Sequence, residues 1–230
     1  MCFSVEADVT AGLLLLPIGI ATLREVKRAR ELPFASLPLL FALHQLVEAV
    51  VWAGADGDVS SGVQHAAAVA YLIFALPVLP ILVPLAVLTL EPNGLRQRVA
   101  PFVALGAAVS AYFTFALLSS PVRVTAHAHA LEYHTGLHNG DLWAVVYVLA
   151  VIGPSLMSGY RTLVAFGILN LVGLSVITVA YVEAFPSLWC IFAGCTSVLI
   201  WLHMFRRRRL PDSDRLHGQR LIAREGSPAR

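Results

Sequence analysis

Residues 34–54 read FASLPLLFALHQLVEAVVWAG, and this stretch decides the fold class. It is apolar over about the 20 residues that a helix needs to cross the hydrocarbon core of a bilayer. Within it, His44 and Glu48 lie one helical turn apart on a common face. Ionisable residues inside a membrane helix face the interior of a bundle and commonly mark a functional site. We therefore predict a transmembrane helix that bears a buried polar pair.

The whole chain has the composition of a membrane protein. Its 230 residues are 58% hydrophobic and only 13% charged, and the mean hydropathy is +0.76, whereas soluble domains are about 25% charged. We predict an all-α polytopic protein, and the apolar stretches predict seven transmembrane helices at about residues 9–25, 34–54, 63–90, 99–118, 142–158, 162–183 and 187–205. Residues 1–205 form this membrane domain. The one lysine, Lys27, lies in an arginine-rich loop, which excludes a retinal Schiff base in a helix.

Basic residues predict the orientation of these helices. They occur in every second connecting segment, at Arg24, Lys27, Arg28, Arg30, Arg96, Arg98, Arg161 and Arg206–Arg209. Because basic segments stay in the cytoplasm, we expect an outer amino terminus and a cytoplasmic carboxyl terminus in a bacterial plasma membrane. The basic tail, 206–230, is expected to be disordered. Its first arginines are expected to bind anionic lipid headgroups, and no nucleic-acid partner is predicted.

Three prolines interrupt the third predicted helix. Pro77, Pro80 and Pro84 occur in PVLPILVP, and each proline removes a backbone hydrogen bond and crowds the preceding turn. We predict a kinked or partly unwound segment. A bend supported by neighbouring helices is favoured over a transport hinge.

Four of the eight histidines lie in HAHALEYHTGLH, residues 127–138, on the predicted outer side. Alternation from Val122 onward predicts a short strand with His127 and His129 on one side. If the following residues are helical, His134 and His138 share a second face. Such imidazole pairs predict a site for zinc or another borderline divalent ion. The alternative is that these histidines only form hydrogen bonds within the loop.

The loop histidines and the second helix are expected to form one outward-facing pocket. In this pocket Glu48 would act as general base on water bound to a metal, with His44 among the ligands. The alternative is a buried His44–Glu48 pair that only holds helices together. Further pocket residues are predicted to be His65, Asp141, Asn170 and Glu183.

Two of the three cysteines are predicted on the outer side. Cys2 precedes the first helix and Cys190 opens the seventh, so a disulfide between them is predicted where the environment is oxidising. The alternatives are that Cys2 is a thiolate ligand or nucleophile, or that both thiols are inert. With three cysteines, spacing alone does not establish the pairing.

The segments MCFSVEAD, LPLLFALHQLVEAVVWAG and YHTGLHNGDLW resemble an uncharacterised bacterial family of small seven-span membrane proteins. The resemblance implies a fold and a topology but no reaction. The chain is also similar in architecture to the alkaline ceramidase and adiponectin-receptor-like superfamily of seven-span zinc hydrolases. That superfamily has two histidines four residues apart in its last span, where this chain has only His203.

Four functions follow from these features. The first is a metal-dependent membrane enzyme, possibly a zinc hydrolase, with Glu48 as its base. The second is a haem or redox protein with His44 and His65 as iron ligands. The third is a transporter, channel or sensor that uses the broken third helix and the buried polar residues. The fourth is an accessory protein whose outer loop docks a partner.

Overall fold

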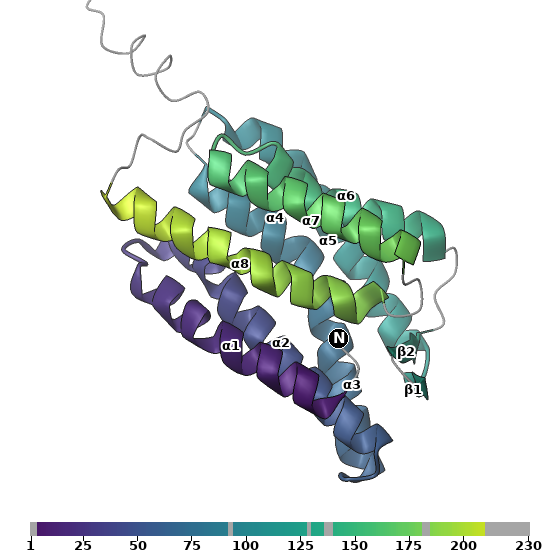
Figure 1. The fold of residues 1–230 in the computed structure, drawn as a ribbon. Coiled ribbons are helices and arrows are strands. Elements are labelled where there is room, and N and C mark those ends of the chain that lie inside the picture. The colour runs from purple at the N-terminus through teal and green to yellow at the C-terminus, as the bar shows by residue number, and fades with distance from the viewer. Residues whose placement is uncertain (1–3, 92–93, 128–129, 136–139, 181–184, 210–230) are drawn as a thin grey trace, which may run out of the picture.

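The computed structural model describes residues 4–91, 94–127, 130–135, 140–180 and 185–209 (Figure 1). The α-helices are α1 (Val5–Arg24), α2 (Leu32–Ala55), α3 (Ser61–Ile73), α4 (Leu79–Leu90), α5 (Arg96–Ser119), α6 (Gly140–Leu156), α7 (Arg161–Ala180) and α8 (Phe185–Arg209). A short 3₁₀ turn, η1 (Ala29–Glu31), precedes α2, and a π-helix, η2 (Phe74–Val78), joins α3 to α4. Within the described residues, helices cover most of each segment that was predicted to be helical.

Among the described residues, four helices are long and apolar enough to cross a membrane, namely Val5–Arg24, Ala29–Ala55, Ser61–Leu90 and Arg96–Ser119. Two further apolar helices in the described part of the chain, Leu142–Leu156 and Arg161–Val176, are shorter. Figure 1 shows α8 lying between α1 and α2 on one side and the α6–α7 pair on the other. The fold is a helical bundle with the apolar helices of a membrane protein.

Helices α1 and α2 pack side by side and run in opposite directions. Gly12 faces Leu46 and Gly19 faces Leu39. Because the helices are antiparallel, a position four residues before Gly12 in α1 lies opposite a position four residues after Leu46 in α2. Asp8 therefore lies at the level of position 50 of α2. Asp8 is therefore within one helical turn of Glu48, since a turn holds 3.6 residues.

The three prolines of the third predicted helix produce the π-helix η2. Because proline has no N–H to donate, the hydrogen-bond ladder widens locally. The hydroxyl of Tyr147 in α6 donates to the carbonyl oxygen of Ala75, at 2.6 Å, and satisfies one of the freed acceptors. Gly106 of α5 lies against the Pro80 carbonyl, where a side chain would not fit. The predicted bend is thus a π-helix supported by α5 and α6.

The two ends of the bundle differ in charge. At one end, the buried Glu91 after α4 accepts a hydrogen bond from the Gly159 N–H before α7, and the Phe34 ring of α2 contacts His203 of α8. These contacts gather the helix ends that carry Arg24, Arg96, Arg161 and Arg206. We call this the basic end. The opposite end holds the start of α1 and the α2–α3 turn, and we call it the hairpin end.

A β-hairpin joins α5 to α6 at the hairpin end. Strands β1 (Arg123–His127) and β2 (Ala130–His134) pair antiparallel, with Arg123 opposite His134. One face packs on Val51, Trp52 and Ala68 through the side chains of Val124, Leu131 and Tyr133. The structure places a strand at Arg123–His127, before and including the first loop histidine. His134 lies in β2, so the helical condition under which His134 and His138 would share a face is not met at His134.

Candidate functional site

Four polar side chains are buried together near the hairpin end of α1 and α2. Asp8, Gln45 and Glu48 are each 0% exposed, and His44 is 3% exposed. The antiparallel register places Asp8 beside the α2 segment that bears the other three. We call these four residues the buried polar cluster. It contains the His44–Glu48 pair predicted from the sequence and two residues, Asp8 and Gln45, that the sequence did not single out.

The cluster contains hydrogen-bonding groups that are not used within the described part of the chain. These groups are Nε2 of His44 and the amide nitrogen and amide oxygen of the Gln45 side chain. Buried polar atoms nearly always have partners, because leaving one without a partner costs about 1–3 kcal/mol. These unused groups lie on the helix that bears the buried Glu48, which makes the cluster a candidate functional site.

A column of stacked rings leads from the hairpin to His44. The Tyr133 ring of β2 stacks on Tyr71 of α3, with centroids 4.8 Å apart, and Tyr71 stacks on His44, with centroids 4.0 Å apart. The Phe74 ring of η2 contacts the same imidazole, with ring centroids 4.8 Å apart. The inner face of the hairpin therefore reaches the buried polar cluster through Tyr71. The π-helix touches the cluster through Phe74.

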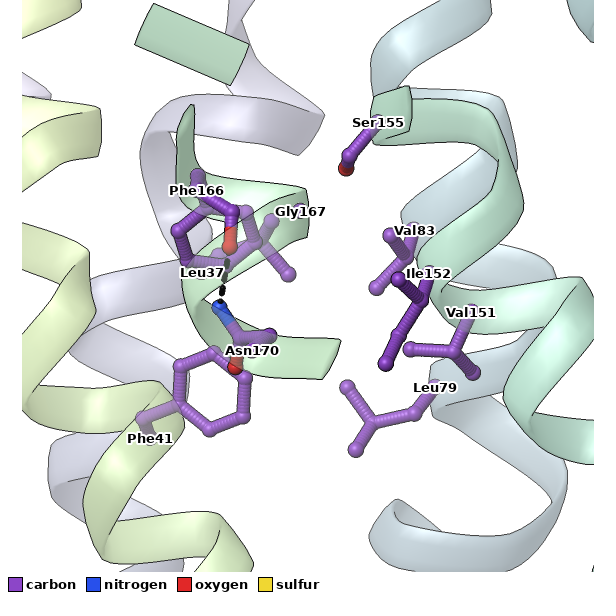
Figure 2. A pocket seen from close by; sticks show the side chains of 10 residues that line it. All are labelled: Leu37, Phe41, Leu79, Val83, Val151, Ile152, Ser155, Phe166, Gly167 and Asn170. Atoms are coloured by element: carbon purple, nitrogen blue, oxygen red, sulfur yellow. Dashed lines mark hydrogen bonds between the residues drawn. The ribbon is translucent and has the colours of Figure 1, made fainter. Parts of the chain in front are cut away.

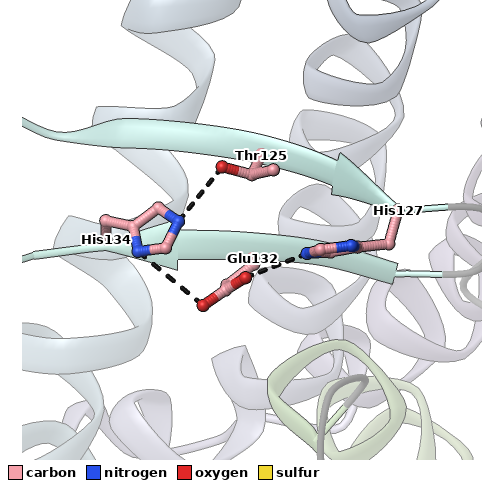
Figure 3. Close-up of polar contacts among 4 residues, drawn as sticks. All are labelled: Thr125, His127, Glu132 and His134. Carbon is pink, nitrogen blue, oxygen red and sulfur yellow. Dashed lines mark hydrogen bonds and ion pairs between the residues drawn. The ribbon is translucent and has the colours of Figure 1, made fainter.

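The outer face of the hairpin carries a separate polar network (Figure 3). Glu132 lies between two histidines: its Oε2 is 2.9 Å from Nε2 of His127, and its Oε1 is 3.7 Å from Nδ1 of His134. The second ring nitrogen of His134 is 3.0 Å from the Thr125 hydroxyl. The hydrogen bond with His127 is the main cause that holds the pKa of the Glu132 carboxyl below its ordinary value of 4.5. All these side chains are exposed, so the network is a surface feature.

The residues that the structure describes do not form the single pocket predicted from the sequence. His127 and His134 lie on the exposed face of the hairpin, whereas Tyr133, on the other face, points toward the cluster. Successive residues of a strand point to opposite faces, so these histidines cannot face His44 and Glu48. Among the described residues, no group of three or more His, Cys, Asp or Glu side chains is arranged to hold a metal ion. The predicted ligands His129 and His138 lie outside the described residues.

The other predicted site residues are dispersed. His65 is exposed near the start of α3, so it does not join the buried polar cluster and is poorly placed to share an iron with His44. Cys2 and Glu183 lie outside the described residues. Asp141 and Cys190 belong to α6 and α8, but their side chains are not described. The disulfide between Cys2 and Cys190 stays a prediction.

Asn170 lines a different site from the one predicted. Its side chain borders a mainly apolar cavity of about 30 Å³ between α2, α4, α6 and α7 (Figure 2). Its amide nitrogen donates to the carbonyl oxygen of Phe166, at 2.8 Å, and to the hydroxyl of Thr196 in α8, at 3.0 Å. Asn170 therefore joins α7 to α8 in the middle of the bundle.

A second buried polar group, at the basic end, was missed by sequence reasoning. Glu91 is 0% exposed and accepts hydrogen bonds from the Ser158 hydroxyl and from the Gly159 N–H, the latter at 3.0 Å. The Tyr160 ring lies edge-on to the buried His203, with centroids 4.8 Å apart. We call Glu91, Ser158, Tyr160 and His203 the basic-end cluster. In the sequence Glu91 precedes Pro-Asn-Gly, a tripeptide typical of loops, so the local pattern gives no sign that Glu91 is buried.

Comparison with known proteins gives a family without an assigned activity. A search of curated proteins and a search of solved structures found no match to the chain. The family model described as "Family of unknown function (DUF6629)" matches residues 1–215. This match covers every described helix and the hairpin, which agrees with the predicted membership of an uncharacterised family. The chain belongs to DUF6629, a family of unknown function.

Proposed function

We propose that this protein is a proton-linked membrane transporter whose buried polar cluster takes up protons from the side of the hairpin. One observation carries the proposal. Two fully buried carboxylates, Asp8 and Glu48, come from neighbouring antiparallel helices and lie at levels less than one turn apart along the helix axis, with His44 and Gln45 at nearby levels of α2. Carboxylates and histidines grouped inside a membrane bundle are typical of proton relays and ion pathways.

The chemistry of the cluster favours a mobile positive charge. Two ionised carboxylates buried in a medium of low polarity lose their hydration. A proton taken up by Asp8 or by Glu48 removes part of this cost. The amide of Gln45 offers both a donor and an acceptor, so it can hydrogen-bond either form of a neighbouring carboxyl group. The cluster can therefore gain and lose a proton without a change of fold.

The surroundings of the cluster favour entry from the hairpin end. The hairpin covers the α2–α3 end of the bundle and contacts His44 through Tyr133 and Tyr71. The exposed polar network of Glu132, His127 and His134 lies on the outer face of this cover. If the basic end is cytoplasmic, as the positive-inside rule predicts, uptake occurs from the outer side.

A zinc-dependent enzyme, the first function predicted from the sequence, has less support. That mechanism needs loop histidines and Glu48 at one ion, and the described loop histidines face away from the bundle. The metal content of purified protein tests this alternative directly. Stoichiometric zinc that is lost in His44→Ala would favour the enzyme over the transporter.

The proposal is tested with the full chain reconstituted in liposomes that contain a pH-sensitive dye. A potassium diffusion potential then drives protons inward. We expect dye acidification well above that of protein-free liposomes, and a loss of at least about tenfold in rate in Glu48→Gln and in Asp8→Asn, since each removes a titrating group.

The matched control is Glu6→Gln, which makes the same chemical change at an exposed carboxylate in the first turn of α1. This variant should conduct like the natural protein. A natural protein that acidifies the liposomes no faster than lipid alone would overturn the proposal. Equal rates in Glu48→Gln and Glu6→Gln would do the same, provided that both variants elute as folded, monodisperse protein.

A further inference from the structure

The cavity beside Asn170 lies between the two buried polar clusters. We infer that it binds water at the hydroxyl of Ser155, and that this water is a hydrated step between the clusters. Its binding follows from the cavity alone, whereas its part in proton movement rests on the proposed function. The described residues that line the cavity come from α2, α4, α6 and α7: Leu37, Phe41, Leu79, Val83, Val151, Ile152, Ser155, Phe166, Gly167 and Asn170.

The first argument is the hydroxyl of Ser155. A serine or threonine in a helix commonly donates to a carbonyl of the preceding turn, and in this chain the buried Thr22 and the exposed Thr114 and Ser175 each donate to the residue four positions earlier. Ser155 is 1% exposed, yet within the described part of the chain its hydroxyl has no hydrogen-bond partner. The group points into the cavity, so a polar occupant would satisfy it (Figure 2).

The second argument is the acceptor on the opposite wall. Both hydrogens of the Asn170 amide are used, because its nitrogen donates to Phe166 and to Thr196. The amide oxygen of Asn170 is therefore the part of the side chain that remains to accept a hydrogen bond at the cavity. Figure 2 shows Ser155 and Asn170 at opposite ends of the cavity, so one water can donate to the Asn170 oxygen and a second can bond to Ser155. With the other water as a neighbour, each water has two polar partners, the lower limit for an ordered buried water.

The third argument is size. The cavity measures about 30 Å³, and one water occupies roughly 10–15 Å³ on the same measure. The space holds about two waters and is too small for a sugar, a nucleotide or a lipid chain. At Gly167 the α7 backbone approaches α6 so closely that a Cβ would lie 3.0 Å from that of Ser155. Neighbouring side chains thus cannot shift inward easily to fill the space.

The cavity lies between the buried polar cluster and the basic-end cluster, which suggests a role for the water. Phe41 on its wall is one helical turn from Gln45 of the buried polar cluster, about 6 Å along α2. On the other side, Ser155 lies in the last turn of α6 and is three residues before Ser158, which follows the helix and donates to Glu91. A water here divides the apolar stretch between the clusters. A proton accepted on one side would be matched by one released on the other, so the water itself is unchanged.

Infrared spectroscopy of Ser155→Cys, in the full chain in lipid nanodiscs, tests the water directly. The S–H stretch is isolated by subtracting the spectrum of the natural protein, which leaves the native cysteines in place. We expect a hydrogen-bonded S–H band that converts to S–D within minutes in D₂O. Ser175→Cys is the matched control, since the hydroxyl it replaces is bonded within its own helix. Its thiol should give a backbone-bonded band whose position does not depend on the cavity.

The possible outcomes are distinct. A free S–H band in Ser155→Cys that persists for hours in D₂O would show a dry cavity and overturn the inference, whatever the proton flux. Rapid exchange without any flux in the natural protein would retain the water site and reject the transporter. If both hold, Ser155→Ala should lower the flux by about fivefold or more, through the loss of one hydrogen bond, whereas Ser175→Ala should not. Equal flux in the two alanine variants would reject the hydrated step as part of the path.

Discussion

Gly19 is the position where the α1–α2 contact depends most on a missing side chain. A Cβ at this residue would lie 2.6 Å from Cα, 2.7 Å from N and 2.9 Å from Cβ of Leu39. These are atoms of the α2 backbone or fixed to it, so no side-chain rotation relieves the overlap. Gly19→Ala therefore has to push α1 away from α2, the helix that bears His44 and Glu48.

The size of the effect follows from these distances. Carbon atoms in ordinary contact are about 3.5–4.0 Å apart, so the helices must separate by about 1 Å, and a gap of that size loses roughly a quarter to a half of the contact energy. Overpacking of this kind costs about 1–3 kcal/mol. Alanine recovers about 0.5–1 kcal/mol through its better helix propensity. We expect a net loss of about 1–2 kcal/mol, which lowers the melting temperature by roughly 2–8 °C.

Thermal unfolding in one detergent, followed by helical circular dichroism, measures this loss. Gly62→Ala is the control, because it makes the same exchange near the start of α3, where nothing lies within 4 Å of the new methyl group. It should be neutral or stabilising by up to about 1 kcal/mol. If Gly19→Ala melts at or above the temperature of Gly62→Ala, the close packing of α1 on α2 is refuted. The level assigned to Asp8 would then lose its support.

Three further changes test other contacts. Tyr147→Phe removes the hydrogen bond to Ala75 and should destabilise the protein by about 1 kcal/mol, which shows as a lower melting temperature. Glu91→Ala leaves two buried donors without an acceptor and should cost about 2–4 kcal/mol, whereas Glu91→Gln keeps an acceptor oxygen and should cost less; equal losses would contradict the hydrogen bonds described. In the hairpin, the contact of ionised Glu132 with His127 contributes stability above pH 4.5 that is lost as the pH falls through the lowered pKa. A carboxyl NMR titration should give a pKa below 4.5 for Glu132, and His127→Ala should raise it toward that value.

Much of the fold follows from the sequence because one physical requirement dominates it. A helix that crosses a bilayer must be mainly apolar over about 20 residues. The segments that form α2 and the continuous helix α3–η2–α4 are therefore recognisable as long, mainly apolar stretches. The buried pair of His44 and Glu48 was predictable for the same reason, because an ionisable group inside such a stretch has to face the interior. The hairpin strand was predictable from the alternation before His127.

The assembly of the site was not predictable, because it depends on which faces meet. A strand changes face at every residue, so whether the loop histidines or Tyr133 point toward the bundle depends on the register against β2 and on the α2–α3 surface. The number of histidines in the loop indicates neither the strand register nor the surface on which the hairpin packs. Asp8 was overlooked for a related reason: an acid in the first turn of a helix is common, since it favours the helix dipole. Only the pairing of Gly12 and Gly19 with α2 reveals that this acid is buried.

The placement of buried polar groups argues for a path and against a single reaction centre. A catalytic pocket gathers its acid, base and ligand groups around one point within hydrogen-bond reach. Here they lie at three levels of one bundle: the Asp8–Glu48 pair near the hairpin, Asn170 at the cavity and Glu91 at the basic end. Each level is costly to keep polar inside a membrane. A purely structural role would explain the hydrogen-bonded Glu91 and Asn170, but not Gln45 or Ser155, whose polar atoms have no partner in the described part of the chain. Transport across the bilayer gives both residues a use, because each can hydrogen-bond a group that passes.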